Sequence, residues 1–208
     1  MKPILYPTLT DYCISLIDEF PRIADKRRAA LSLLSDYMRG KHSRRQPAAL
    51  IVICTHNSRR SHLGQLWLQM AALYYGIENV CTYSGGTEAT AFHPHAVDSL
   101  RRAGFKVEAA RQDTNPVYAV RASDDMPIWP TYSKRYNDSA NPDRNFAAIM
   151  VCTDADQNCP VVPGAETRIS LPYQDPKAYD GTSQEAEQYD QCCRQIAREM
   201  FYAVSRVR

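Results

Sequence analysis

Residues 50 to 61, LIVICTHNSRRS, carry the arrangement in this chain best suited to chemistry. An apolar strand runs into Cys54, and a short loop then leads to the start of a helix. Such a loop leaves backbone N–H groups without helical partners beside the positive end of the helix dipole, which suits a tetrahedral oxyanion. The same amides and the guanidinium of Arg60 stabilise a thiolate. We therefore predict that Cys54 is a nucleophile at an oxyanion site.

The spacing between Cys54 and Arg60 supports this interpretation, because five residues let the loop curl round an anion. A planar guanidinium, which donates two parallel hydrogen bonds, then closes the far side. Ser61 can hydrogen-bond the thiolate. The residues expected to bind the oxyanion are Thr55, His56, Asn57, Ser58, Arg59 and Arg60. A buried structural cysteine followed by a basic turn is the alternative, and the flanking strand and helix disfavour it.

A C-x5-R-S motif between a strand and a helix, with Asn57 inside the loop, resembles the low-molecular-weight protein tyrosine phosphatases. Thioredoxin-coupled arsenate reductases share that fold and loop. Two positions depart from the resembled pattern: His56 stands where a glycine is expected, and Arg59 where a second cysteine is common. A non-glycine residue is strained if the loop needs positive φ at His56, and the change could also alter which anion fits.

Two further cysteines, Cys152 and Cys159, lie in the segment VCTDADQNCP at the end of a predicted strand. Their spacing is too wide for a CxxC zinc knuckle, but a polar turn of this size can bring two thiols within disulfide distance. The segment resembles the C-x-D-A-D-x-x-C-P segment of the thioredoxin-coupled arsenate reductases. That resemblance implies a disulfide relay from Cys54 to Cys152 to Cys159, with thioredoxin as reductant. Two unrelated surface cysteines are the alternative.

Asp175 and Pro176 follow the last predicted strand, where their loop would overhang the anion site. A carboxyl group there can protonate a leaving oxygen, and both resembled families carry an Asp-Pro acid in this place. Phosphatases usually follow the proline with aromatic residues, whereas Lys177 and Ala178 follow it here. This favours a small inorganic substrate over an aryl phosphate.

Three functions therefore stay open. The preferred one is a thioredoxin-coupled arsenate reductase. The second is a phosphatase that acts on phosphotyrosine or another phosphomonoester through a phosphocysteine at Cys54. The third is an anion- or redox-sensing module without turnover. The resemblance implies no metal or organic cofactor for either enzyme.

Alternating strands and helices position these residues. The apolar runs predict a four-stranded parallel sheet with helices on both faces, in the flavodoxin-like order 2-1-3-4 of the low-molecular-weight phosphatase fold. In that order strands one and three are neighbours, and ligands bind outside their carboxyl ends. Cys54 and Cys152 should therefore meet at one sheet edge. The four predicted strands are residues 50–54, 80–84, 146–152 and 167–171.

Three segments lie outside this alternation. Residues 9–39 contain two helical patterns, and residues 1–47 should form a helical extension packed on the sheet of a domain spanning 48–208. Residues 115–143 form a long stretch that we expect to be a functional or disordered loop, whose aromatic residues could hold a phenyl phosphate. Thr182 and Glu185 form a predicted capping box that opens the last helix.

Composition limits the remaining function classes. A net charge of +2 over 208 residues is too mild to indicate a nucleic-acid partner. The chain has no signal segment and no apolar run long enough to span a bilayer, so we expect no membrane association. Seven cysteines without an export signal predict a cytoplasmic protein whose thiols are reduced at rest.

Overall fold

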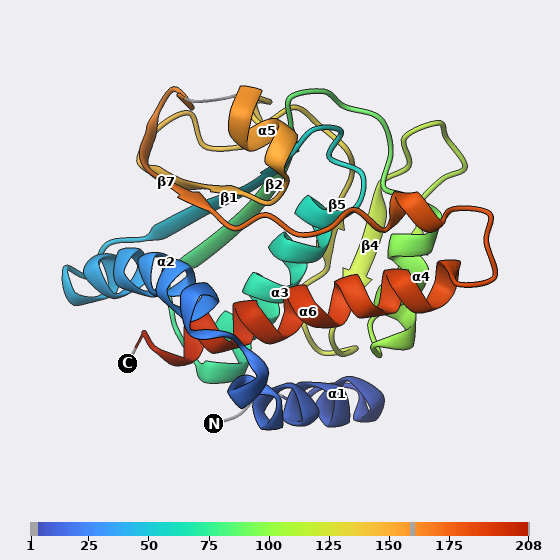
Figure 1. The fold of residues 1–208 in the computed structure, drawn as a ribbon, viewed down its shortest axis with the longest axis horizontal. Helices are drawn as coiled ribbons and strands as arrows, with labels where there is room; N and C mark the ends of the chain where they lie inside the picture. The colour runs from blue at the N-terminus through green and yellow to red at the C-terminus, as the bar shows by residue number, and fades with distance from the viewer. Residues whose placement is uncertain (1–3, 159–160, 208) are drawn as a thin grey trace.

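Figure 1 shows the computed structural model, which describes residues 4 to 158 and 161 to 207. At its centre is a four-stranded sheet in the order β2-β1-β6-β7. All three pairings are parallel, which confirms the predicted order 2-1-3-4. The strands are β1 (Ala48–Cys54), β2 (Val80–Gly86), β6 (Phe146–Met150) and β7 (Ala165–Ser170).

The two central strands, β1 and β6, are apolar and almost fully buried because both faces of the sheet are covered. Figure 1 shows α3 (Arg60–Tyr75) and α6 (Glu185–Ser205) below the sheet and α5 (Thr153–Asn158) above it, as the prediction of helices on both faces requires. The helix α4 (Pro94–Arg102) packs against α6. Gly64 lets α3 approach the sheet closely, since a Cβ there would lie 2.8 Å from a Val52 methyl group.

The N-terminal residues form two helices, α1 (Pro7–Asp18) and α2 (Asp25–Ser43), joined by the short 3-10 helix η1 (Phe20–Arg22). Both predicted helical patterns are confirmed. The ring of Tyr12 in α1 stacks on Trp67 at 5.3 Å, in the middle of the core. In α2, Arg27 forms a 2.7 Å ion pair with the buried Glu199 of α6. The extension is thus packed against the main body, and the domain boundary at residue 48 stays a prediction.

The expectation that residues 115–143 form a long loop is wrong, whereas a functional role for them stays a prediction. Two strands of this stretch, β4 (Tyr118–Arg121) and β5 (Trp129–Thr131), join β3 (Lys106–Ala109) in an antiparallel sheet ordered β3-β4-β5. The chain then runs along the end of β2, where Gly86 and Arg135 form an isolated bridge. The stretch therefore supports the carboxyl end of the main sheet.

Two predicted element ends also differ. The strand β6 ends at Met150, so Cys152 lies two residues beyond it, and α5 occupies the predicted polar turn. The capping box is wrong, because α6 begins at Glu185 without a side-chain cap. The carboxylate of Glu185 instead accepts a hydrogen bond from the N–H of Gly181. The segment before α6 contains a second 3-10 helix, η2 (Pro176–Tyr179).

Among the residues described, no helix combines the length and the apolar composition needed to span a bilayer.

Candidate active site

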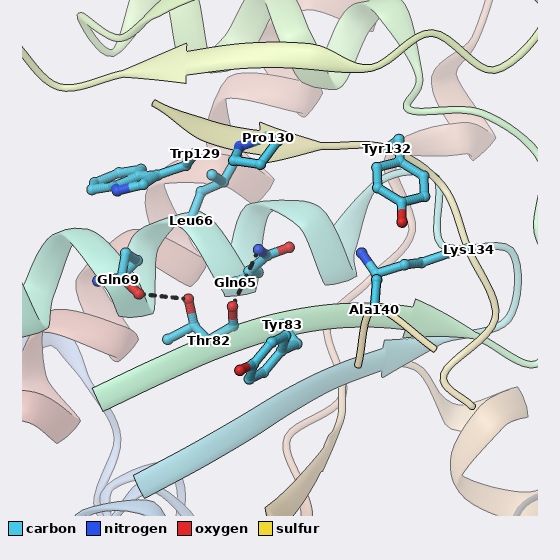
Figure 2. Close-up of a pocket in the computed structure, with 10 residues that line it drawn as sticks. All are labelled: Gln65, Leu66, Gln69, Thr82, Tyr83, Trp129, Pro130, Tyr132, Lys134 and Ala140. Atoms are coloured by element: carbon cyan, nitrogen blue, oxygen red, sulfur yellow. Dashed lines mark hydrogen bonds between the residues drawn. The ribbon is translucent and has the colours of Figure 1, made fainter. Parts of the chain in front are cut away.

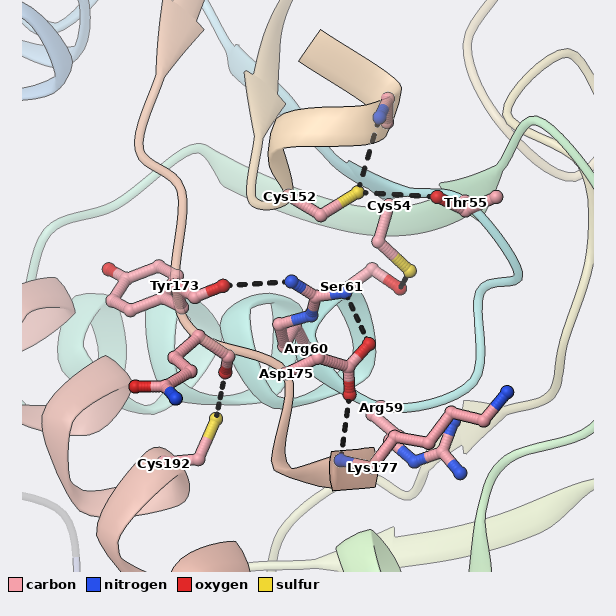
Figure 3. A network of polar contacts seen from close by, with 12 residues as sticks. Cys54, Thr55, Arg59, Arg60, Ser61, Cys152, Tyr173, Asp175, Lys177 and Cys192 are labelled. Carbon is pink, nitrogen blue, oxygen red and sulfur yellow. Dashed lines mark hydrogen bonds and ion pairs between the residues drawn. The ribbon is translucent and has the colours of Figure 1, made fainter. Parts of the chain in front are cut away.

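The strand β1 delivers Cys54 to the mouth of the loop that enters α3 (Figure 3). The Cys54 thiol is only 4% exposed, and its Sγ lies 3.1 Å from Ser61 Oγ. Asn57 Nδ2 donates to the same Ser61 oxygen at 2.8 Å. Because Asn57 occupies an acceptor position of Ser61, the hydroxyl hydrogen is free to point at Cys54. This arrangement directs a hydrogen-bond donor at the Cys54 sulfur.

Asn57 also fixes the path of the loop. Its φ of +44° lies in the left-handed region, which Asn tolerates better than most residues, and its Oδ1 accepts from the backbone N–H of Lys134 at 2.8 Å. The expected strain at His56 is wrong, because His56 is not among the described residues with positive φ. The unusual backbone conformation falls one position later, on a residue type suited to it.

The end of β2 lies so close to this loop that it must be glycine. A Cβ on Gly86 would stand 2.6 Å from the Thr55 oxygen and 2.7 Å from the Asn57 nitrogen. The N–H of Gly86 donates to the Lys134 carbonyl at 3.0 Å. Lys134 therefore joins β2 and the loop through its two backbone groups.

Arg60, the first residue of α3, is buried beneath the overhanging segment after β7. Its Nη1 donates to the Tyr173 carbonyl at 2.8 Å, and its Nη2 donates to Asp175 at 2.5 Å. Its Nε is buried and has no hydrogen-bond partner in the part of the chain that the structure describes. An incoming oxyanion can take the Nε–H and compete with Asp175 for Nη2.

Asp175 sits where the sequence predicts an acid, directly against Arg60 (Figure 3). Its second carboxylate oxygen accepts from the N–H of Lys177 at 3.1 Å and so caps η2. The side chain remains partly exposed, at 37%. It can therefore exchange protons with solvent while it faces the loop.

Cys152 comes to the same sheet edge as Cys54, as the predicted topology requires. Its thiol is 1% exposed, and its Sγ lies 3.4 Å from the hydroxyl of Thr55, the residue after Cys54. The N–H of Ala155 in α5 points at the same sulfur, at 3.4 Å. Cys159 lies outside the described residues.

The other loop side chains contact neighbouring elements. His56 lies 3.6 Å from Glu88, and Arg59 donates to Tyr189 at 2.6 Å and to Asp180 at 3.0 Å. Because Asp180 neutralises the Arg59 guanidinium, any contact of Arg59 with an oxyanion would come from its backbone N–H. Ser58 is buried, and its carbonyl accepts from the N–H of His93. No group of three or more potential metal ligands occurs among the residues described.

Solved structures share this fold. A low-molecular-weight phosphotyrosine phosphatase from Vibrio cholerae O395 superposes with a TM-score of 0.50 at 16% identity, over 76% of this chain and 95% of that one. An arsenate reductase in its phosphate-binding state gives a TM-score of 0.50 at 16% identity, over 77% and 99%. At these identities the likeness shows the fold alone.

Sequence similarity decides the family. No family model matches the chain. An arsenate reductase of Bacillus licheniformis is 30% identical to it over 137 residues, which are 64% of this chain and 77% of that protein. The chain belongs to the family of arsenate reductases and low-molecular-weight protein tyrosine phosphatases. It is therefore an enzyme of this family.

Sequence reasoning missed several residues that support the site of this family member. Lys134 and Asp180 hold the loop from elements that lie far away in the sequence. The Tyr173 carbonyl aligns Arg60, and Tyr189 connects Arg59 to Asp180, to which its hydroxyl donates at 2.7 Å. These contacts depend on how the elements pack, and no local sequence motif predicts them. Of the residues that hold the loop, only Asn57 could be identified from the sequence, because it lies inside the C-x5-R-S motif.

His62 gives a pH-dependent test of the packing behind the loop. It is fully buried, with Nδ1 3.1 Å from the Ser84 hydroxyl, and burial lowers its pKa to about 3. Between about pH 6.5 and 3 the unfolded chain binds a proton at His62 that the folded chain does not. The contribution of His62 to the free energy of unfolding is therefore complete above pH 6.5 and decreases as the pH falls below that value. Stability should drop by about 1.4 kcal/mol per pH unit in that window.

The variant His62→Gln should remove this loss while keeping an acceptor for Ser84. Urea unfolding at pH 6.5 and at pH 5 gives the free energy of unfolding at each pH. Between these two values it should fall by roughly 2 kcal/mol more in the wild type than in the variant. The control His95→Gln changes a histidine whose side chain is 38% exposed. Its free energy of unfolding should fall by as much between the two pH values as that of the wild type. An equal loss in His62→Gln would contradict the assignment.

Proposed function

We propose that the chain is a thioredoxin-coupled arsenate reductase. The observation that carries the proposal is the position of Cys152, whose sulfur contacts the loop residue that follows Cys54. A phosphatase of this fold needs one thiol at the oxyanion loop, whereas a reductase needs a second thiol that can reach the first. The presence of Lys177 after Pro176, in place of an aromatic residue, supports a small inorganic substrate.

In the first step, arsenate enters the loop and the Cys54 thiolate attacks arsenic. The loop amides and Arg60 hold the negative charge, and Ser61 hydrogen-bonds the Cys54 sulfur. Asp175 delivers its proton to the departing hydroxide, which leaves as water. The product is a Cys54 sulfur–arsenic(V) adduct.

In the second step, the Cys152 thiolate attacks the Cys54 sulfur. The electron pair of the sulfur–arsenic bond passes to arsenic, which is reduced from As(V) to As(III) and leaves as arsenite, while a Cys54–Cys152 disulfide forms. The backbone N–H of Ala155 donates a hydrogen bond to the Cys152 sulfur and holds it in place. Cys159 then attacks Cys152, frees the Cys54 thiolate and leaves a Cys152–Cys159 disulfide.

The last exchange has a conformational requirement. Residues seven apart along a helix are separated by about 10 Å, whereas a disulfide needs Cα atoms within about 7 Å. Because α5 occupies Thr153–Asn158 between the two cysteines, the proposed disulfide requires α5 to unwind. A helix of six residues is easily unwound, since helices this short are marginal without tertiary support.

Thioredoxin would reduce the Cys152–Cys159 disulfide and return all three thiols. This cycle needs no metal or organic cofactor in the chain, and it fits a cytoplasmic location, where thiols are kept reduced. The chain needs no nucleic-acid or membrane partner for it.

The alternative is a phosphatase, because Cys54, Arg60 and Asp175 alone could form and hydrolyse a phosphocysteine. Two of the aromatic residues expected to hold a phenyl phosphate do not support this alternative. Trp129 and Tyr132 instead line a separate cavity with residues of α3 and β2.

The test is turnover of each substrate by the purified chain. With thioredoxin, thioredoxin reductase and NADPH, arsenate should drive continuous NADPH oxidation, and Cys54→Ser should stop it. The control Cys81→Ser, at an exposed cysteine, should behave as wild type. Hydrolysis of a chromogenic phosphate ester without arsenate-dependent NADPH oxidation would favour the phosphatase. Anion binding without turnover of either substrate would favour the sensing module.

A further inference from the structure

A cavity of about 270 Å³ lies between the main sheet and the small antiparallel sheet (Figure 2). Its floor comes from α3 and β2, and its roof from β5 and the segment after it. The aromatic rings of Tyr83, Trp129 and Tyr132 line it, with the aliphatic side chain of Leu66. A cavity of about 150 Å³ holds benzene, so this one has room for a substituted aromatic ring.

Two polar groups that line this cavity lack a close partner. The whole residue Lys134 is 6% exposed, its side chain lines the cavity, and among the residues described its ammonium group forms no ion pair with a carboxylate within 4 Å. The ring of Tyr132 lies 4.7 Å from that group, and Asp138 is the carboxylate whose charge reaches it. Burial lowers the pKa of Lys134. A cation that is largely removed from solvent and has no close counter-ion favours the binding of an anionic ligand.

Gln65 is the second group. It is 9% exposed, its Nε2 donates to the Thr82 carbonyl at 3.3 Å, and its Oε1 is buried without a hydrogen-bond partner. Figure 2 shows this amide between Thr82 and Lys134 in the cavity. An unpaired buried acceptor is complementary to a ligand N–H.

We propose that this cavity binds a small aromatic carboxylate that also carries an N–H donor. The carboxylate pairs with Lys134, the N–H donates to the Gln65 Oε1, and the ring packs among Tyr83, Trp129 and Tyr132. This chemistry is distinct from that of the oxyanion loop, which takes a tetrahedral anion, and the site goes beyond the proposed reductase function.

The cavity is connected to the loop. The backbone N–H of Lys134 donates to Asn57, which donates to Ser61 beside Cys54. The charge of Lys134 also acts on His62, the residue after Ser61. A ligand carboxylate that cancels this charge lowers the positive potential at His62 and at the loop next to it. Occupancy of the cavity should therefore slow reactions of Cys54.

The binding test uses 4-aminobenzoate, with benzoate as the probe without an N–H and aniline as the probe without a charge. The chain has two tryptophans, so its nitrogen-15 NMR spectrum has two indole N–H signals, which Trp129→Phe assigns. 4-Aminobenzoate should shift the Trp129 signal and leave that of the core residue Trp67 in place. The shift should persist in saturating phosphate, because the loop is a different site.

Two variants separate the contacts. Lys134→Met keeps the backbone bonds and should weaken 4-aminobenzoate and benzoate by about ten- to hundredfold. Gln65→Met should weaken 4-aminobenzoate by about three- to tenfold and leave benzoate unchanged. Absence of a Trp129 shift in the wild type, loss of the shift in phosphate, or wild-type affinity for 4-aminobenzoate in both variants would overturn the site. None of these outcomes bears on arsenate turnover, so failure here is separate from failure of the proposed function.

The rate of Cys54 alkylation tests separately whether the cavity and Cys54 are coupled. Bound 4-aminobenzoate should slow alkylation of Cys54 by iodoacetamide roughly twofold or more, and Lys134→Met should be slow already and insensitive to the probe. An unchanged alkylation rate in the wild type at saturating probe would overturn the coupling.

Discussion

Replacing Cys152 with serine should abolish arsenite release in the thioredoxin-coupled assay. A serine hydroxyl at this position cannot attack the Cys54 sulfur, so the enzyme would stall after forming the arsenic adduct. The same variant should still hydrolyse a chromogenic phosphate ester if the chain has that activity, because Cys54, Arg60 and Asp175 are unchanged. Arsenite measured after quenching, alongside ester hydrolysis, separates the two effects.

Burial makes a matched control necessary. Cys152 is 1% exposed, so serine there could destabilise the fold as well as remove the thiol. Cys13→Ser changes an equally buried cysteine in α1, away from the loop, and should keep coupled turnover in proportion to its folded fraction. Full turnover in Cys152→Ser would show that the relay is wrong.

The order of the relay can be read from trapped disulfides. Cys159→Ser after a single turnover should accumulate a Cys54–Cys152 disulfide, whereas the wild type without thioredoxin should stop at Cys152–Cys159. Peptide mapping by mass spectrometry distinguishes these products. If Cys159→Ser also keeps full coupled turnover, the phosphatase becomes the better interpretation.

The main sheet was predictable because its strands have a simple physical signature. The central strands β1 and β6 are continuous apolar runs, as strands buried on both faces must be. Once their neighbours alternate with helices, right-handed crossovers leave few possible orders. The meeting of Cys54 and Cys152 at one edge follows from that order alone.

The small sheet carried no such signature. Its strands are three or four residues long and partly exposed, and β5 contains Pro130, which argues against a strand. They exist because β3, β4 and β5 pair with one another and pack against the core, where Val107 and Val120 are buried. The hexapeptide that forms α5 is similarly uninformative, since its acidic residues suit both a polar turn and the first turn of a helix.

Within the site, the residues that react were predictable and the residues that hold them were not. Cys54, Arg60 and Ser61 are fixed by a short motif whose spacing has a chemical meaning. The hydrogen bonds from Lys134 to Asn57 and from Arg59 to Asp180 span 77 and 121 positions of sequence. Such contacts form only after the elements pack, and no local pattern encodes them.

Asp175→Asn should lower kcat for arsenate by roughly 100-fold or more, because asparagine cannot deliver a proton to the leaving oxygen. Asp180→Asn is the matched control. Asp180 lies five residues later in the same segment, pairs with Arg59, and is similarly exposed, so loss of its charge should change kcat far less. Steady-state kinetics of both variants in the coupled assay provide the comparison.

The KM of the Asp175→Asn variant tests how the site works before the chemical step. In the structure Asp175 accepts a hydrogen bond from the Arg60 Nη2, so an incoming anion must displace this carboxylate from the guanidinium. That displacement would also turn Asp175 from a counter-ion of Arg60 into an acid facing the leaving group. Asparagine competes more weakly for Arg60, so KM should stay the same or fall while kcat drops. A raised KM with unchanged kcat would instead mean that Asp175 only orients Arg60 and that the Asp-Pro pair is a structural turn.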